Sequence, residues 1–160
     1  MVNWSDKWNL YFNAGKCKVL HYGRKNPNIE YTMGNDNERV RLTVCDEEKD
    51  LGVIFDKNLK FDKQVESSVQ KANKMLGIIK RSFTYLDEDM FLRLYKSLIR
   101  PHLEYGNVIW NPYLKRQSAR IESVQRRATR LLKTTRHLSY IDRLHKFDLS
   151  SLKFRRLRGD

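Results

Sequence analysis

Residues 94–110, LYKSLIRPHLEYGNVIW, decide the fold class of this chain together with residues 121–133, IESVQRRATRLLK. The first stretch is too apolar and aromatic for a solvated tail, and only Pro101 interrupts it. Because proline lacks an N–H and its ring clashes with the preceding turn, we expect a helix to kink or restart there. The second stretch has the period of an amphipathic helix with an arginine face. The C-terminal part is therefore expected to be helical.

The sequence before residue 94 changes character near Phe61. After it, apolar residues recur at spacings of three and four, which indicates helices. Before it, alternating apolar and polar runs bounded by glycine, asparagine and proline indicate strands. Two helical stripes are predicted, Val65, Val69, Ala72, Leu76 and Ile79, then Phe91, Leu94, Tyr95 and Leu98.

The N-terminal third is predicted to be a small antiparallel β-sheet with a flanking helix, which makes the chain α+β. A glycine inside the last predicted strand, Gly52, is expected to mark a bulge or a close backbone approach. We divide the chain into a β region at 1–60, helices at 61–112 and a basic helical extension at 113–160. The predicted elements are a helix at 3–12, strands at 16–22 and 49–55, a hairpin of 29–33 with 40–45 around residues 34–37, a helix at 116–133, and short helices at 140–144 and 152–157.

The charge of the chain favours a polyanionic partner. The net charge is +13, and residues 113–160 hold 14 Lys or Arg against 4 Asp or Glu, so +10 of it lies there. Such asymmetry most often indicates nucleic acid, although a solvated basic surface or an acidic protein partner would give the same pattern. With no run of about 18 apolar residues and no signal peptide, we expect an intracellular protein, nuclear or cytoplasmic, without a membrane partner.

No constellation in the sequence supports catalysis or metal binding. A polymerase needs closely placed carboxylates for two metal ions, and the chain has no Asp-Asp pair. The stretch that most resembles a catalytic carboxylate motif is YLDED at 85–89, and there Asp87 stands at a position typical of a helix N-cap. Cys17 and His21 lack a second ligand pair, and Cys17 and Cys45 are expected to be buried free thiols. We therefore predict no catalytic residue, no metal ligand and no cofactor in this chain.

The basic helix is the best functional signal. At about 100° per residue, Arg120, Arg127 and Arg130 fall within roughly 40° of Arg116, while the apolar residues cluster on a different arc. One face would pack on the body and the other would pair with phosphates, which the planar guanidinium fork suits. Nothing in the helix reads base identity, so we expect little sequence specificity. The predicted nucleic-acid-binding residues are Arg116, Arg120, Arg126, Arg127, Arg130 and Lys133.

Five blocks, in order, resemble the end of a non-LTR (LINE-type, jockey-like) retrotransposon reverse transcriptase. The match covers nearly the whole chain, and the five blocks in one order are more specific than any single one. The 49–53 block, KDLGV, resembles the primer grip, with Leu51, Gly52 and Val53 as its site residues. The others are WSDKWNL at 4–10 with Asn13, Lys16 and Cys17; KAN at 71–73 with Leu76, Gly77 and Ile79; LYKSLIRP at 94–101 with Leu103, Glu104, Tyr105 and Trp110; and Glu122, Val124 to Ala128, Tyr140, Arg143 and Leu144.

The resemblance implies a palm edge, a primer grip and a thumb, which cradle an RNA–DNA or DNA duplex by its backbone. It also implies that the fingers and most of the palm, with the catalytic aspartates and their Mg²⁺, would lie before Met1. We therefore expect this RNA-directed DNA polymerase fragment to be inactive alone, with the missing half as a possible partner. The alternative is a stand-alone basic module that binds nucleic acid or protein without enzymatic activity.

Overall fold

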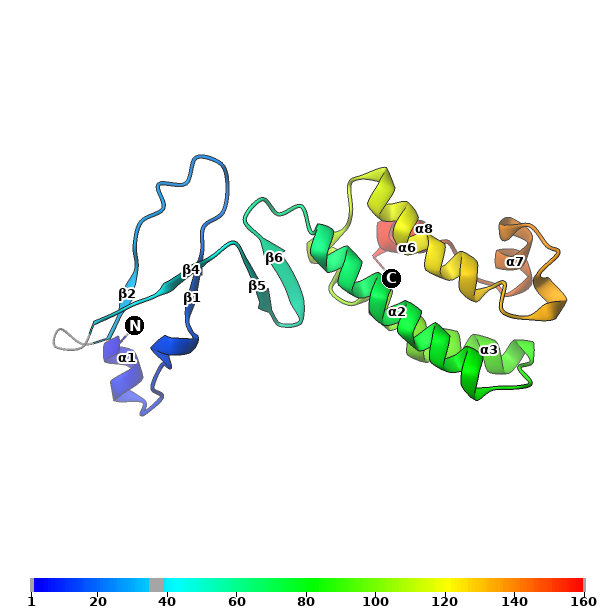
Figure 1. Cartoon of the computed structure of the whole chain (residues 1–160), viewed down its shortest axis with the longest axis horizontal. Helices are drawn as coiled ribbons and strands as arrows, with labels where there is room; N and C mark the ends of the chain where they lie inside the picture. Colours follow the sequence, from blue (N-terminus) through cyan, green and yellow to red (C-terminus); the bar gives the residue numbers. More distant parts are fainter. Residues whose placement is uncertain (1, 35–38, 160) are drawn as a thin grey trace. The chain divides into compact units, whose positions relative to one another are not determined.

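The structure is a computed structural model that describes residues 2–34 and 39–159, and it divides into the units Met1–Lys60 and Phe61–Asp160. Strands in the first unit and helices in the second confirm the α+β class (Figure 1). The first unit has α1 (Val2–Lys7), η1 (Ala14–Lys16), β1 (Lys18–Leu20), β2 (Thr32–Met33), β3 (Val40–Arg41), β4 (Thr43–Cys45), β5 (Glu47–Asp50) and β6 (Val53–Asp56). The second has α2 (Asp62–Ser82), α3 (Glu88–Leu94), η2 (Tyr95–Ile99), α4 (Arg100–Glu104), α5 (Asn107–Trp110), α6 (Lys115–Ala128), η3 (Lys133–Thr135), α7 (Tyr140–Lys146) and α8 (Leu152–Arg158).

The strands of the first unit form three two-stranded sheets rather than one antiparallel sheet. The pairing of β2 with β3 confirms the predicted hairpin, although residues 35–37 of its predicted turn lie outside the described residues. The strands β1 and β4 are parallel, with Val19 opposite Val44. An alternating pattern predicts which side chains share a face but not the direction of the partner strand, so the antiparallel prediction was wrong for this pair.

Residues 49–55 form a tight hairpin where one strand was predicted. Strands β5 and β6 are antiparallel, with Asp50 opposite Val53, and Leu51 and Gly52 make the two-residue connection. Their φ angles are +43° and +86°, as a type I′ turn requires at both central positions. Gly52 therefore serves a turn and not a bulge.

The N-terminal helix is shorter than predicted and leaves its aromatic residues exposed. Helix α1 ends at Lys7, and Trp8 follows in a turn. The rings of Trp4 and Trp8 contact each other at a centroid distance of 6.5 Å, and both residues are more than half exposed. The predicted apolar face is therefore present in the sequence but is not buried in this unit.

The core of the second unit lies where α2 packs against α6 and against the helix that contains η2 and α4 (Figure 1). The first predicted stripe is largely confirmed, because Val65, Val69, Ala72 and Ile79 are buried. Helices α7 and α8 confirm the two predicted short helices near the C-terminus. The buried apolar residues of this unit also include Phe91, Tyr95, Ile99, Leu103, Trp110, Ile121, Val124, Ala128, Leu132, Phe147 and Leu152.

The α-helical segment α4 begins at Arg100 and has Pro101 in its first turn, in line with the predicted restart, and a π-helical turn precedes it. Helices α3 and α4 are joined through η2, whose π-type bonding includes Arg100 N–H to Tyr95 C=O. A π turn widens the helix, so a carbonyl that would face the missing N–H of proline is accommodated. The same turn places Ile99 in the core, while Leu98, which was predicted for the stripe, is 39% exposed.

The basic helix ends earlier than predicted, at Ala128 rather than at residue 133. The hydroxyl of Thr129 donates to Gln125 C=O at 3.0 Å, and Thr129 C=O accepts from the Thr135 hydroxyl at 2.9 Å. Thr129 N–H still donates to Gln125 C=O, but the N–H groups of Arg130 and Leu131 bond only three residues back, to Arg127 C=O and Ala128 C=O. The α-helical ladder therefore ends here, and Arg130 and Lys133 lie beyond the helix.

Candidate nucleic-acid interface

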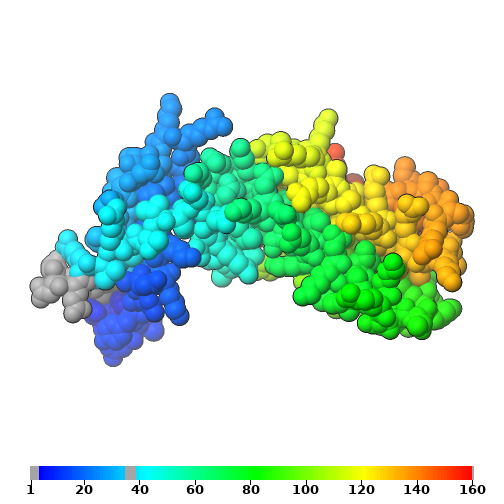
Figure 2. Space-filling model, viewed as in Figure 1, coloured from blue at the N-terminus to red at the C-terminus, as the bar shows by residue number. Residues whose placement is uncertain are grey.

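Helix α6 presents one arginine face to solvent. Arg116, Arg120 and Arg127 are exposed, and a regular helix holds them within about 40° of one another. The opposite face is buried against the body and holds both apolar residues, among them Ile121 and Val124, and polar ones, which fixes the orientation of the helix. Arg116 lies 3.4 Å from Asp62 at the start of α2, and both side chains of this pair are largely exposed. Figure 2 shows this part of the second unit in yellow.

The other three predicted binding residues do not belong to this face. Arg126 lies over the ring of Tyr140, with its Cζ 4.6 Å from the centroid, and so points toward α7. Arg130 and Lys133 are exposed but follow the end of the helix. The structure therefore groups Arg116, Arg120 and Arg127 and separates them from Arg126.

The 51–53 site residues occupy the tip of the β5–β6 hairpin. Leu51 is 85% exposed and has a positive φ angle, which a branched residue adopts at a cost of order 1 kcal/mol or more. Val53, two residues later, is buried and anchors the hairpin. A strained, exposed apolar side chain on an anchored turn is a feature typical of contact loops.

Buried polar residues connect α6 to its neighbours, and the sequence pattern missed them. The hydroxyl of Tyr95 donates to Gln125, whose side-chain amide donates to Tyr140 Oη at 3.1 Å and to Ser150 C=O at 3.0 Å. The hydroxyl of Tyr140 in turn donates to the Glu122 carboxylate. Burial raises the pKa of both tyrosines well above the usual range, so they remain hydrogen-bond donors. These bonds link positions 15 to 30 residues apart, beyond the reach of helical periodicity.

Glu122 caps helix α8. Its Oε1 accepts from the N–H of Leu152 and its Oε2 from the N–H of Lys153, each at 3.3 Å. Ser151 Oγ accepts from Phe154 N–H, so the first turn of α8 is satisfied by side chains. The buried carboxylate of α6 thus holds α8 in place.

Several cations of the basic C-terminal segment serve the fold. Arg143 is buried and donates to Thr129 Oγ1 and to Leu138 C=O, at 3.1 and 2.6 Å. Arg155 makes a two-point bond to Glu104, at 2.6 and 3.2 Å. The +10 charge of this segment therefore overstates what a polyanion would meet.

Two of the acidic residues at 85–89, Asp87 and Glu88, have structural roles. Asp87 is the N-cap of α3 and accepts from Met90 N–H at 2.7 Å, as predicted. Glu88 pairs with Lys146 at 2.6 Å, and that hydrogen bond lowers the pKa of Glu88. Within residues 2–34 and 39–159, no three His, Cys, Asp or Glu side chains lie close enough to hold a metal ion.

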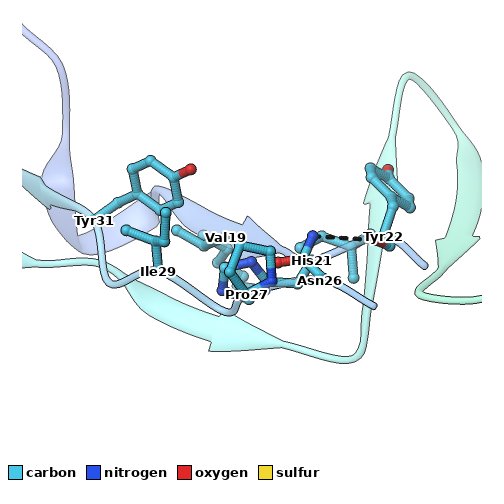
Figure 3. Close-up of a pocket in the computed structure, with 9 residues that line it drawn as sticks. Val19, His21, Tyr22, Asn26, Pro27, Ile29 and Tyr31 are labelled. Atoms are coloured by element: carbon cyan, nitrogen blue, oxygen red, sulfur yellow. Dashed lines mark hydrogen bonds between the residues drawn. The ribbon is translucent and has the colours of Figure 1, made fainter. Parts of the chain in front are cut away.

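A hollow of about 570 Å³ lies on the first unit, beside β1 and the loop that follows it (Figure 3). Asn26 donates to Tyr22 C=O at 3.0 Å, and the rings of His21 and Tyr31 lie 6.3 Å apart. None of the described residues that line this hollow is Asp, Glu or Cys. The hollow therefore offers neither a carboxylate–histidine pair nor a set of metal ligands.

The chain is similar to two RNA-directed DNA polymerases of mobile elements. It is 27% identical over 138 residues to the probable RNA-directed DNA polymerase from transposon X-element of Drosophila melanogaster, and 29% identical over 110 residues to the RNA-directed DNA polymerase from mobile element jockey of Drosophila funebris. These matches cover 81% and 64% of the chain but only 14% and 11% of the relatives. An uncharacterized protein of Caenorhabditis elegans is 24% identical over 120 residues, which are 73% of the chain and 61% of that protein.

No protein-family model and no solved structure matches the chain. In the part of the chain that the structure describes, every helix is too short or too polar to cross a lipid bilayer.

Proposed function

We propose that this chain is a C-terminal part of a retrotransposon reverse transcriptase, comprising the palm edge, primer grip and thumb, and that it binds a nucleic-acid duplex through the backbone. The observation that carries the proposal is the exposed face of Arg116, Arg120 and Arg127 on an anchored helix, in a chain similar to RNA-directed DNA polymerases. Guanidinium groups on one rigid face can neutralise neighbouring phosphates without reading bases.

The β5–β6 hairpin supports the same function. Its tip projects Leu51 into solvent, which suits a loop that steadies a primer end. We assign the hairpin to the primer and the α6 face to the duplex backbone. Arg130 and Lys133, which are exposed after the end of α6, are assigned as further phosphate contacts.

Replacing Arg116, Arg120 and Arg127 by alanine is expected to weaken binding to an RNA–DNA duplex. For each phosphate that the variant no longer neutralises, the slope of log K against log salt concentration should become shallower by about 0.9. The measurement is fluorescence anisotropy of a labelled duplex across a salt series, with the purified chain.

A matched control removes three exposed cations from the first unit, Lys7, Arg24 and Lys25. This variant has the same net charge as the arginine variant but keeps every residue of the α6 face, so its salt slope should stay near that of the wild type. An unchanged slope in the arginine variant, or equal slopes in the two variants, would reject the α6 face as the contact surface.

The chain alone is expected to incorporate no nucleotide. Phosphoryl transfer by a polymerase needs paired carboxylates at the reacting phosphate, and the sequence lacks an Asp-Asp pair. The test is extension of a primed template with Mg²⁺ and nucleotides, and an added active reverse transcriptase serves as the positive control. Template-dependent product from the chain itself would contradict the proposal.

A second candidate is a basic binding module without a polymerase half. The match to the C. elegans protein favours it, because the aligned segment makes up 61% of that protein, against 14% and 11% of the two polymerases. The two candidates share the binding surface. They differ in whether a separately supplied fingers and palm half restores primer extension.

A further inference from the structure

A groove of about 670 Å³ lies on the second unit, between the segment before α6 and helices α6, α7 and α8. Aliphatic side chains form part of its walls, and two of them are strongly exposed, since Ile141 is 65% and Leu157 is 70% accessible. Pro112, Leu114, Ala119 and Leu144 are the other aliphatic residues of the lining. Exposed apolar side chains around a concave surface are typical of sites that bind a partner.

The same groove is strongly basic. Lys115, Arg126 and Lys153 are exposed where they line it, and Arg156 lies in its wall at 8% exposure. The only carboxylate among the described lining residues is Glu122, and both its oxygens already accept hydrogen bonds from Tyr140 and from the first turn of α8. The groove is therefore lined by four cations and a single carboxylate, so its lining carries an excess of positive charge.

Arg156 is the most informative of these cations. Its Nη2 donates to Ser118 Oγ at 2.9 Å, but Nε and Nη1 are buried and have no hydrogen-bond partner among the described residues. Burial lowers the pKa of this guanidinium, with partial compensation from the charges of Glu122 and Glu104. Because buried guanidinium nitrogens without acceptors are costly, the site would be stabilised by an anionic group from outside the chain.

We propose that this groove binds an acidic peptide segment of a partner protein. Apolar side chains of the peptide contact Ile141, Leu144 and Leu157, and its carboxylates pair with the flanking cations, one of them at Arg156. The inference goes beyond the proposed function, since Arg120 and Arg127 do not line the groove.

The walls favour a peptide over a single-stranded nucleic acid. Sequence-tolerant strand binding uses several aromatic platforms on which bases stack. Here Tyr113 is the exposed aromatic residue of the described lining, and Tyr140 is covered by the guanidinium of Arg126. Aliphatic walls between cations instead match a segment with alternating apolar and acidic side chains.

The test is a selection from a displayed library of random short peptides on the full chain, followed by anisotropy with the enriched peptides. We expect acidic residues next to Leu, Ile or Phe. Affinity should fall by about tenfold or more both in Arg156→Met, which keeps an unbranched apolar stem but removes the guanidinium, and in the surface variant with Lys115→Glu and Lys153→Glu. As a control, Lys71→Glu reverses an exposed charge on α2 and should leave affinity unchanged.

Three outcomes would overturn the proposal. One is the absence of acidic and apolar enrichment. Another is enriched peptides that bind the groove variants as well as the wild type. The third is a labelled oligothymidylate that binds the wild type but not the groove variants, while no peptide binds at all. The double lysine variant keeps the test decisive even if the change at Arg156 disturbs folding.

Discussion

Replacing Glu122 by alanine is expected to lower the free energy of unfolding of the second unit by about 3 kcal/mol, because hydrogen bonds to a charged group contribute more than neutral ones. The change would remove the acceptor for Tyr140 and for two N–H groups of α8. It would also take away the largest charge that offsets the buried Arg156 guanidinium. Loss of one partner from a buried set of charges leaves the other uncompensated. Urea unfolding followed by the helical circular dichroism signal measures this change.

The contribution of charge compensation can be separated from that of capping. If Glu122 offsets Arg156, the double variant with Arg156→Met should be destabilised by less than the sum of the two single changes, by about 1 kcal/mol. Glu66→Gln, on the exposed side of α2, is the control and should change stability by less than about 0.5 kcal/mol. Equal destabilisation at positions 66 and 122 would show that Glu122 caps nothing.

Local patterns predicted the helices of the second unit well, and the reasons for the failures are physical. The apolar residues from Val65 to Ile79 recur with the period of an α-helix. That period alone places them on the face of α2 that packs in the core. The helix at 116–133 was predicted too long because the apolar period continues through Leu131 and Leu132, whereas the N–H groups after Thr129 bond three residues back instead of four. The π turn before Pro101 and the parallel direction of β4 against β1 follow from no repeat in the sequence, so a periodic pattern could not predict them.

In the candidate site, too, the features that follow from a helical repeat were predictable and the others were not. The arginine face was predictable, since Arg116, Arg120 and Arg127 share a face of one helix. The groove was not, because three separate segments, at 111–126, 140–144 and 151–157, line it, and no repeat in the sequence shows that they come together. Composition also could not tell which cations form hydrogen bonds within the unit. Nothing in the sequence distinguishes Arg143 and Arg155 from Arg120, but Arg143 bonds to Thr129 and Arg155 bonds to Glu104.

Replacing Trp110 by alanine is expected to cost about 3–5 kcal/mol, the range for a fully buried large aromatic residue. Trp110 has no exposed surface, and its Nε1–H donates to Tyr105 C=O at 2.8 Å, so the change leaves a cavity and an unsatisfied carbonyl. Trp110→Phe should recover part of this stability, because it keeps an aromatic ring in the core but loses the hydrogen bond, worth about 1 kcal/mol, and leaves a smaller cavity where the rest of the indole lay. Urea unfolding by circular dichroism again provides the measurement.

The neighbouring Val108 supplies the matched control. It lies on the same short helix α5, is 87% exposed, and should tolerate alanine with a change below about 0.5 kcal/mol. The comparison tests which of the three apolar residues Val108, Ile109 and Trp110 face solvent and which lie in the core. From composition alone, all three would be expected to be buried. If Val108→Ala cost as much as Trp110→Ala, α5 would pack by a different face. The wall of the groove that begins at Asn111 would then also be placed differently.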